Sequence, residues 1–139
     1  MNPNKIINGT FGTIWVNNEK WIETKSFEAK VTGQYEDVDI AGKLGKSRKY
    51  IGYEGSGSIN TNKVYSRGAK LLAEAFKTGN MPEIKIISKL SDPSSYGAER
   101  VIIKDVTFDE FTLAKFELKS PLEEELPFQF GDYELIDTI

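Results

Sequence analysis

The fold is indicated first by the stretch Ser26-Phe27-Glu28-Ala29-Lys30-Val31-Thr32, in which apolar and polar side chains alternate. Alternate residues of a β-strand point to opposite faces, so the apolar members of this stretch share one face. A strand with one buried and one solvated face is typical of an antiparallel sheet. Just before it, the β-rich runs 13–16 and 21–24 surround a polar, Asn-rich break, which predicts a hairpin.

Most of the remaining chain also has β character. Further strands are predicted at Tyr50–Asn60, Glu83–Leu90, Glu99–Phe108, Thr112–Lys119 and Leu126–Phe130. The third and fourth of these are predicted to form a hairpin, because only a few residues separate them. Pro127 predicts that the last one is an edge strand, or at least that the backbone nitrogen of Pro127 faces away from a partner strand, since proline has no N–H to donate.

One helix is predicted, over residues 66–77. Its apolar residues Ala69, Leu72, Ala73 and Phe76 recur at helical spacing, and Gly79 is a natural C-terminal stop. The fold class that follows is mainly β. We expect a two-sheet antiparallel β-sandwich or small barrel with this one helix at one end.

The composition excludes several classes of enzyme and binding site. The 139 residues include no Cys and no His, so disulfides, Cys/His zinc sites and Ser-His-Asp or Cys-His catalytic groups are impossible. The net charge of −3 disfavours a broadly basic nucleic-acid binder. The length predicts a single domain spanning residues 1–139. No apolar run reaches the roughly 18 residues that a membrane span needs, so no membrane contact is expected.

Two segments lack the periodicity of a strand or a helix. Residues 1–12 are expected to form a flexible N-terminal arm, and residues 34–49 a long loop. A loop of about 15 residues is long for a compact domain, and such loops are usually functional. We therefore expect this loop to dock on another surface through its sparse apolar residues and its basic cluster, which are Val38, Ile40, Leu44, Lys43, Lys46, Arg48 and Lys49.

The charge distribution suggests a partner for that basic cluster. Residues 121–139 carry acidic side chains and no Lys or Arg. One interpretation is that the two regions are simply solvated surfaces. The other is that they meet across subunits and set the register of an assembly, with Glu123, Glu124 and Glu125 as the acidic partners.

Motifs for catalysis or ligand binding are weak. Gly45-Lys46-Ser47 resembles the end of a phosphate-binding loop, but Ile40 occupies the position of a required glycine and no helical pattern follows. A glycosidase-like pair could be drawn from Asp37, Asp39 and Glu54. With 21 acidic residues in the chain, however, some pairing is unavoidable. No catalytic, cofactor or metal site is therefore predicted.

Several segments taken together resemble the tail tube proteins of contractile-tailed bacteriophages, in particular those of phage-like elements of Gram-positive bacteria. The segments are Gly9–Trp15, Asp39–Gly45, Tyr50–Ile59 and the helix that follows. The resemblance depends on their order and on the length of the chain. The tube protein of type VI secretion is a similar fold and an alternative assignment.

The resemblance implies a structural virion protein, not an enzyme. Its subunits would form hexameric rings that stack into a hollow tube inside a contractile sheath, between a baseplate initiator and a tail terminator. The tube would pass DNA without binding it specifically, or would puncture a cell as part of a phage-derived bacteriocin. Such a protein is made in the host cytoplasm and resides in the virion tail. The resemblance further implies contacts between rings for the arm, the long loop and the segment after Pro121.

The residues themselves leave two other functions open. A monomeric small barrel could bind an apolar ligand, and two carboxylates facing one cleft could form a hydrolase.

Overall fold

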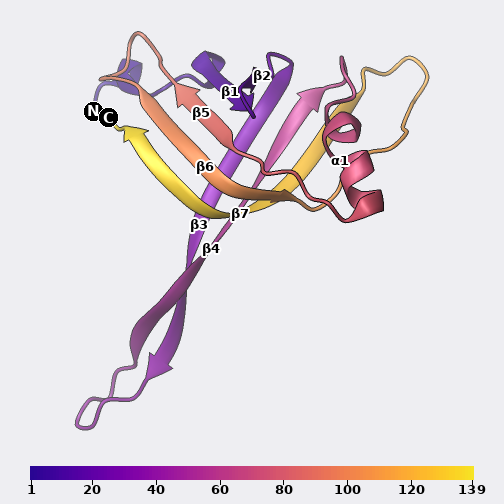
Figure 1. Ribbon diagram of the computed structural model, residues 1–139. Coiled ribbons are helices and arrows are strands. Elements are labelled where there is room, and N and C mark those ends of the chain that lie inside the picture. Colours follow the sequence, from indigo (N-terminus) through magenta and orange to yellow (C-terminus); the bar gives the residue numbers. More distant parts are fainter.

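The computed structural model describes residues 1–139 and contains one antiparallel sheet, one α-helix and two short 3₁₀ turns (Figure 1). The sheet has the strand order β2-β1-β5-β6-β7-β4-β3. Its strands are β1 (Gly12–Val16), β2 (Glu19–Lys20), β3 (Thr24–Val38), β4 (Ser47–Asn62), β5 (Ile86–Leu90), β6 (Glu99–Phe108) and β7 (Glu123–Asp137).

The mainly β class with one helix is confirmed, but the prediction of two separate sheets is wrong. All seven strands belong to one hydrogen-bonded sheet. This sheet curves strongly, so that β1 near one end contacts β3 at the other (Figure 1). Asp105 in β6 contributes to the curvature, because its φ of 53° lies in the left-handed region and distorts the ladder locally. The result is closer to the small-barrel form of the prediction than to a sandwich.

The enclosed face of the sheet carries the hydrophobic core. Val16, Ile86 and Ile103 lie in one cross-strand row of this core and are almost fully buried. The ring of Phe128 packs against Phe27 and Phe108, with ring centroids 6.0 Å and 5.8 Å away. Only 20 of the 139 residues are buried, so the core is small for a chain of this length.

The helix α1 (Arg67–Thr78) forms where the sequence predicts it and ends at Gly79, whose φ is 79°. Its buried positions are Gly68, Leu72 and Ala75, one step around the helix from the predicted stripe. Glycine at position 68 allows this rotation, because a Cβ there would lie 2.9 Å from the Leu126 side chain of β7. The apolar spacing therefore found the helix but misplaced its contact face.

A hairpin forms at the predicted place, but its second strand is β2, inside the predicted polar break, and not the predicted run 21–24. β1 and β2 are joined by Asn17 and Asn18, whose φ values of 49° and 69° suit a tight hairpin turn. β6 covers the predicted residues Glu99–Phe108. No helix of the structure is long and apolar enough to cross a membrane.

Two predictions for the C-terminal third are wrong. Residues 112–119 do not form a strand but lie in the connection between β6 and β7. The strand predicted at residues 126–130 is the longer β7, and it lies between β6 and β4 instead of at an edge. Pro127 is tolerated there because the β6 ladder ends at the pair Phe108–Phe128, one residue before the proline is reached.

The N-terminal arm is folded onto the body. It contains the 3₁₀ turns η1 (Pro3–Lys5) and η2 (Gly9–Phe11). Between them, the backbone N–H of Asn8 donates a 2.9 Å hydrogen bond to Asp92, in the link between β5 and β6.

Candidate assembly surfaces

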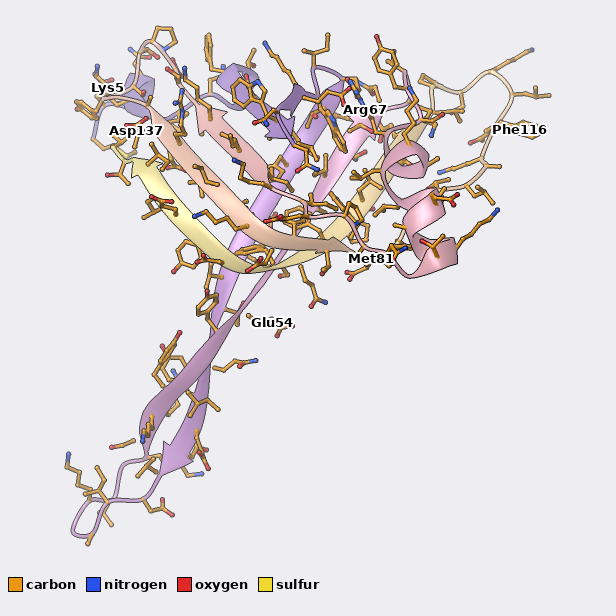
Figure 2. The ribbon with its side chains drawn as sticks, in the orientation of Figure 1. Lys5, Glu54, Arg67, Met81, Phe116 and Asp137 are labelled. Atoms are coloured by element: carbon orange, nitrogen blue, oxygen red, sulfur yellow. The ribbon has the colours of Figure 1, made fainter.

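The predicted long loop is largely a projecting β-ribbon. β3 and β4 pair from Thr24–Thr61 to Val38–Ser47, whereas β7 pairs with β4 only as far as Gly55. Beyond that point the two strands extend away from the body, with Glu54 near the base of the projection (Figures 1 and 2). The predicted bounds 34–49 are therefore wrong, and the connection spans residues 39–46 alone. Both faces of the ribbon are exposed, so no alternation marks its strands in the sequence.

Seven of the ten predicted interface residues come together at the free end of this ribbon. Three are apolar and exposed, and Leu44 has no protection from solvent at all, with a relative exposure of 108%. The seven residues are Val38, Ile40, Lys43, Leu44, Lys46, Arg48 and Lys49, which we call the ribbon tip.

The ribbon is stabilised by contacts between its own side chains. The Tyr35 and Tyr50 rings meet edge to face with centroids 5.6 Å apart. The Arg48 guanidinium lies over the Tyr35 ring, 4.3 Å from its centroid. In addition, the strand register places Glu36 opposite Lys49 and Asp37 opposite Arg48, so residues of opposite charge face each other across the two strands. These contacts matter because an isolated two-stranded ribbon is at best marginally stable in water.

The three predicted acidic partners occupy three different environments. Glu123 is exposed and its carboxylate lies 2.5 Å from the ammonium of Lys25 on β3. The hydrogen bond from Lys25 holds the pKa of Glu123 below its ordinary value. Glu125 is exposed on the opposite face of β7 from the core. Glu124, between them, points into the protein and is 1% exposed.

Glu124 is a structural residue of its own subunit. Its carboxylate accepts hydrogen bonds from the backbone N–H groups of Gly68 at 3.4 Å and Thr112 at 3.1 Å, and the Lys63 ammonium lies 3.8 Å away. Gly68 is in the first turn of α1, where Ser66 makes no side-chain cap hydrogen bond. The carboxylate therefore replaces the cap and meets the positive end of the helix dipole. It is not available to the ribbon tip of another subunit.

An ion-pair cluster around Arg67 was not predicted. Its guanidinium bonds to Glu23 at 2.5 Å and also to Glu19, and it lies over the rings of Trp21 and Tyr65. Burial by itself raises the pKa of Glu23, but the hydrogen bond from Arg67, a backbone hydrogen bond and the charge of Arg67 together outweigh burial and leave that pKa below its ordinary value. The cluster fixes the start of α1 to β2 and to the segment between β2 and β3. No local sequence pattern reveals this cluster, because Glu23 and Glu19 precede Arg67 by 44 and 48 residues.

The sheet face opposite the core is polar over β3, β4, β7 and the end of β6. The register aligns Lys30, Ser56, Gln129 and Thr107 in one row across these four strands. Neighbouring rows add Ser58 and other small or polar residues, and α1 packs on the other side of the sheet. No element of the subunit covers this surface, which we call the polar face.

β3 also provides an unpaired edge. It is the last strand of the sheet, and its fifteen residues pair with β4 on one side only. Such an edge presents backbone N–H and C=O groups that can pair with another chain. The polar face, the ribbon tip and this edge are all features of a subunit that is completed by neighbours.

A family model described as phage tail tube protein matches residues 1–137. The chain belongs to this family. Its match to the family model confirms the resemblance found in the sequence. The phage-like element PBSX protein XkdM of Bacillus subtilis strain 168 is 34% identical to this tail tube protein over 135 residues, which cover 96% of this chain and 92% of XkdM.

Solved structures of contractile and tailed particles share the fold. A chain of the sheath–tube complex of the extracellular contractile injection system PVC superimposes with a TM-score of 0.71 at 11% identity, over 95% of this tail tube protein and 92% of that chain. A chain from the tail of an empty gene transfer agent particle, determined with C6 symmetry, has a TM-score of 0.57 at 14% identity. The match covers 94% of this tail tube protein and 98% of that chain. At these identities the likeness concerns the fold alone.

Proposed function

We propose that this tail tube protein forms six-membered rings that stack into the hollow inner tube of a contractile tail. The observation that carries the proposal is the surface of the single subunit. A compact monomer of 15.6 kDa exposes about 7,200 Å², whereas this subunit exposes 9858 Å². The excess of about 2,600 Å² exceeds three times the roughly 800 Å² that one partner contributes to a standard interface. The C6 symmetry of the related gene transfer agent tail supports the number six.

The polar face is the surface that we assign to the lumen. It is formed by hydroxyl, amide and charged side chains, with no continuous apolar area that would need another protein to cover it. Across β3, β4 and β7 its charged residues have both signs and are mostly acidic: Lys30 beside Glu28, Glu54, Glu123 and Glu125. Because every lysine–phosphate contact releases counterions and adds affinity, a conduit for DNA works best without a basic wall. A polar face with this mixed charge meets that requirement.

The ribbon tip is the surface that we assign to contacts between stacked rings. The ribbon tip projects far beyond the body of the subunit (Figure 1), which would bring it within reach of a neighbouring ring. Its exposed apolar residues would be buried there, and its lysines would pair with acidic residues of the next ring. The exposed acids of the second half of β7 are the remaining candidates for this pairing, because Glu124 is buried and Glu125 lies on the polar face. Such pairing should weaken as ionic strength rises.

The proposed role is structural, and its further partners are other tail components. A sheath protein would surround the tube, and a baseplate initiator and a tail terminator would occupy its ends. The particle is either a phage tail that passes DNA without specific contacts or a bacteriocin whose tube punctures a cell. The fold relative in a sheath–tube complex supports the sheath as a partner.

The mass of the purified protein in solution tests the proposal. Sedimentation of the protein over a hundredfold range of concentration should show rings or longer polymers, and negative-stain electron microscopy should show annular particles or hollow filaments. A single-subunit mass at every concentration would instead favour a monomeric binding module.

A further inference from the structure

Residues 112–119 have the sequence of a strand but no strand partner. In Thr112-Leu113-Ala114-Lys115-Phe116-Glu117-Leu118-Lys119, small or apolar residues alternate with charged ones from Ala114 onward. In the subunit these residues are irregular. Leu113, Phe116 and Leu118 are 79%, 85% and 86% exposed, and Phe116 lies at the outer end of the connection, away from the sheet (Figure 2). An anchored segment with this much exposed apolar surface indicates a contact that the single subunit lacks.

The base of the segment is held firmly. The Phe111 ring meets Phe76 of α1 edge to face at 5.5 Å, and the N–H of Thr112 donates to the buried Glu124. The N–H of Asp109 donates to the carbonyl of Pro127 at 3.0 Å. These contacts direct the following residues outward from the α1 side of the subunit, so the segment is presented to a neighbour.

The complementary surface is the unpaired edge of β3. Along its first residues, Thr24–Phe27, lies an open groove of about 570 Å³ between β3 and β1. The groove is lined by Trp21, Ile22 and Leu90 together with three lysines, and no carboxylate lines it. The edge therefore offers unpaired backbone groups beside an apolar surface with positive charge.

We propose that residues 112–119 of one subunit add as a strand to the β3 edge of the next subunit around the ring. The proposal rests on the ring formation proposed above. A closed ring needs two different complementary surfaces on each subunit, and the segment and the edge are such a pair. Strand addition supplies backbone hydrogen bonds, and the alternating side chains supply specificity.

Side-chain chemistry on both faces agrees with this pairing. The segment's Ala114, Phe116 and Leu118 would continue the face of β3 that carries Phe27 and Val31, where Val31 is 43% exposed. The charged residues of the segment would lie on the polar face, beside Glu28 and Lys30. If Glu117 lies opposite Lys30 in an antiparallel pairing, Lys119 lies opposite Glu28. In a parallel pairing with the same starting point, Lys115 lies opposite Glu28 instead. Opposite charges then meet at both positions.

The absence of cysteine allows a direct test by engineered disulfides. A Phe116→Cys variant is mixed in equal amounts with an Ala29→Cys or a Val31→Cys variant, assembled and oxidised. A covalent dimer is expected in one of the two mixtures: with Val31→Cys for an antiparallel strand and with Ala29→Cys for a parallel one. Each variant carries one cysteine, so the dimer joins two subunits. Tyr96→Cys, at a position 76% exposed in the turn between β5 and β6, is the matched control and should give no dimer with either β3 variant.

Hydrogen exchange of the unmodified protein gives a second readout. Ring formation should slow the exchange of amides between residues 113 and 119 at least tenfold relative to dissociated subunits. Rings that form without a specific dimer, or with unchanged exchange in this segment, would overturn the strand addition and leave the tube function standing. An absence of rings in electron microscopy would overturn both proposals.

Discussion

Replacing Glu124 by glutamine tests the finding that this acid acts inside its own subunit. The carboxylate accepts hydrogen bonds from Gly68 and Thr112 and has Lys63 nearby. Glutamine keeps the size of the side chain, but it has one acceptor oxygen and must turn an NH₂ group toward one of the two donors. One hydrogen bond to a charged group is therefore lost, which costs about 1.5–3 kcal/mol. The second is weakened and the helix end loses its negative partner, at about 0.5–1 kcal/mol.

The expected total for Glu124→Gln is a loss of about 3 kcal/mol of unfolding free energy. For a chain of this length, that corresponds to a decrease of about 10 °C in Tm. Thermal unfolding of the dissociated subunit, followed by circular dichroism, measures it. Glu125→Gln is the matched control, because the neighbouring residue has the same chemistry on the exposed face and should change stability by less than about 0.5 kcal/mol. If Glu124→Gln has the same Tm as the wild type but assembles poorly, Glu124 belongs to an interface between subunits and its internal role is refuted.

Three further predictions follow from other parts of the structure. Deleting residues 38–46 and closing the ribbon with Asn-Gly should leave a folded subunit that no longer stacks, because only exposed residues are removed; tubes that still form in electron microscopy would contradict the role of the ribbon tip. Hydrogen bonds from Ser94 and Asn8 lower the pKa of Asp92, so the stability that this carboxylate contributes is present above its unfolded pKa of about 4 and is lost as pH falls through its lower folded pKa. The difference in urea unfolding between wild type and Asp92→Asn should therefore shrink below about pH 4, and a difference independent of pH would exclude this linkage. Gly57→Ala should prevent normal folding, because a Cβ there would lie 2.6 Å from the Phe128 ring and closer still to the backbone of β3; an unchanged Tm would show that the ring and the β3 backbone can both shift, and would contradict this reasoning.

Strands and helices that bury one face were predictable from the sequence. Residues 99–108 form β6 as expected, and the turn at Asn17 and Asn18 follows from two residues that tolerate positive φ. The helix was found by its apolar spacing and its terminal glycine. The family was also recognisable, since the order of its segments survives in the chain.

Elements without a buried face were not predictable in this way. The sequence predicts a loop where the ribbon stands, because the residues of the ribbon are exposed to solvent on both faces and show no alternation. Residues 112–119 show the reverse error, since a clear strand pattern has no partner in the subunit. Alternation reports which residues will be buried and not what buries them. In a protein that assembles with copies of itself, a residue with the pattern of a buried strand can be covered by a neighbouring subunit and not by its own chain.

Charge patterns had the same limit. The acidic run at residues 123–125 looks uniform in sequence, yet alternation along β7 places Glu124 inside and its neighbours outside. Its role at the start of α1 depends on a contact 56 residues away in the sequence. The same holds for Arg67, whose partners precede the ribbon while the arginine follows it.

Cryo-electron microscopy of the assembled protein tests the central claim most directly. A reconstruction should show a hollow tube with six copies in each ring, the β3 edge of each copy covered by another, and Ser56 and Gln129 on the wall of the channel. Particles that stay single at every concentration, or a tube with the polar face turned to the outside, would contradict the account.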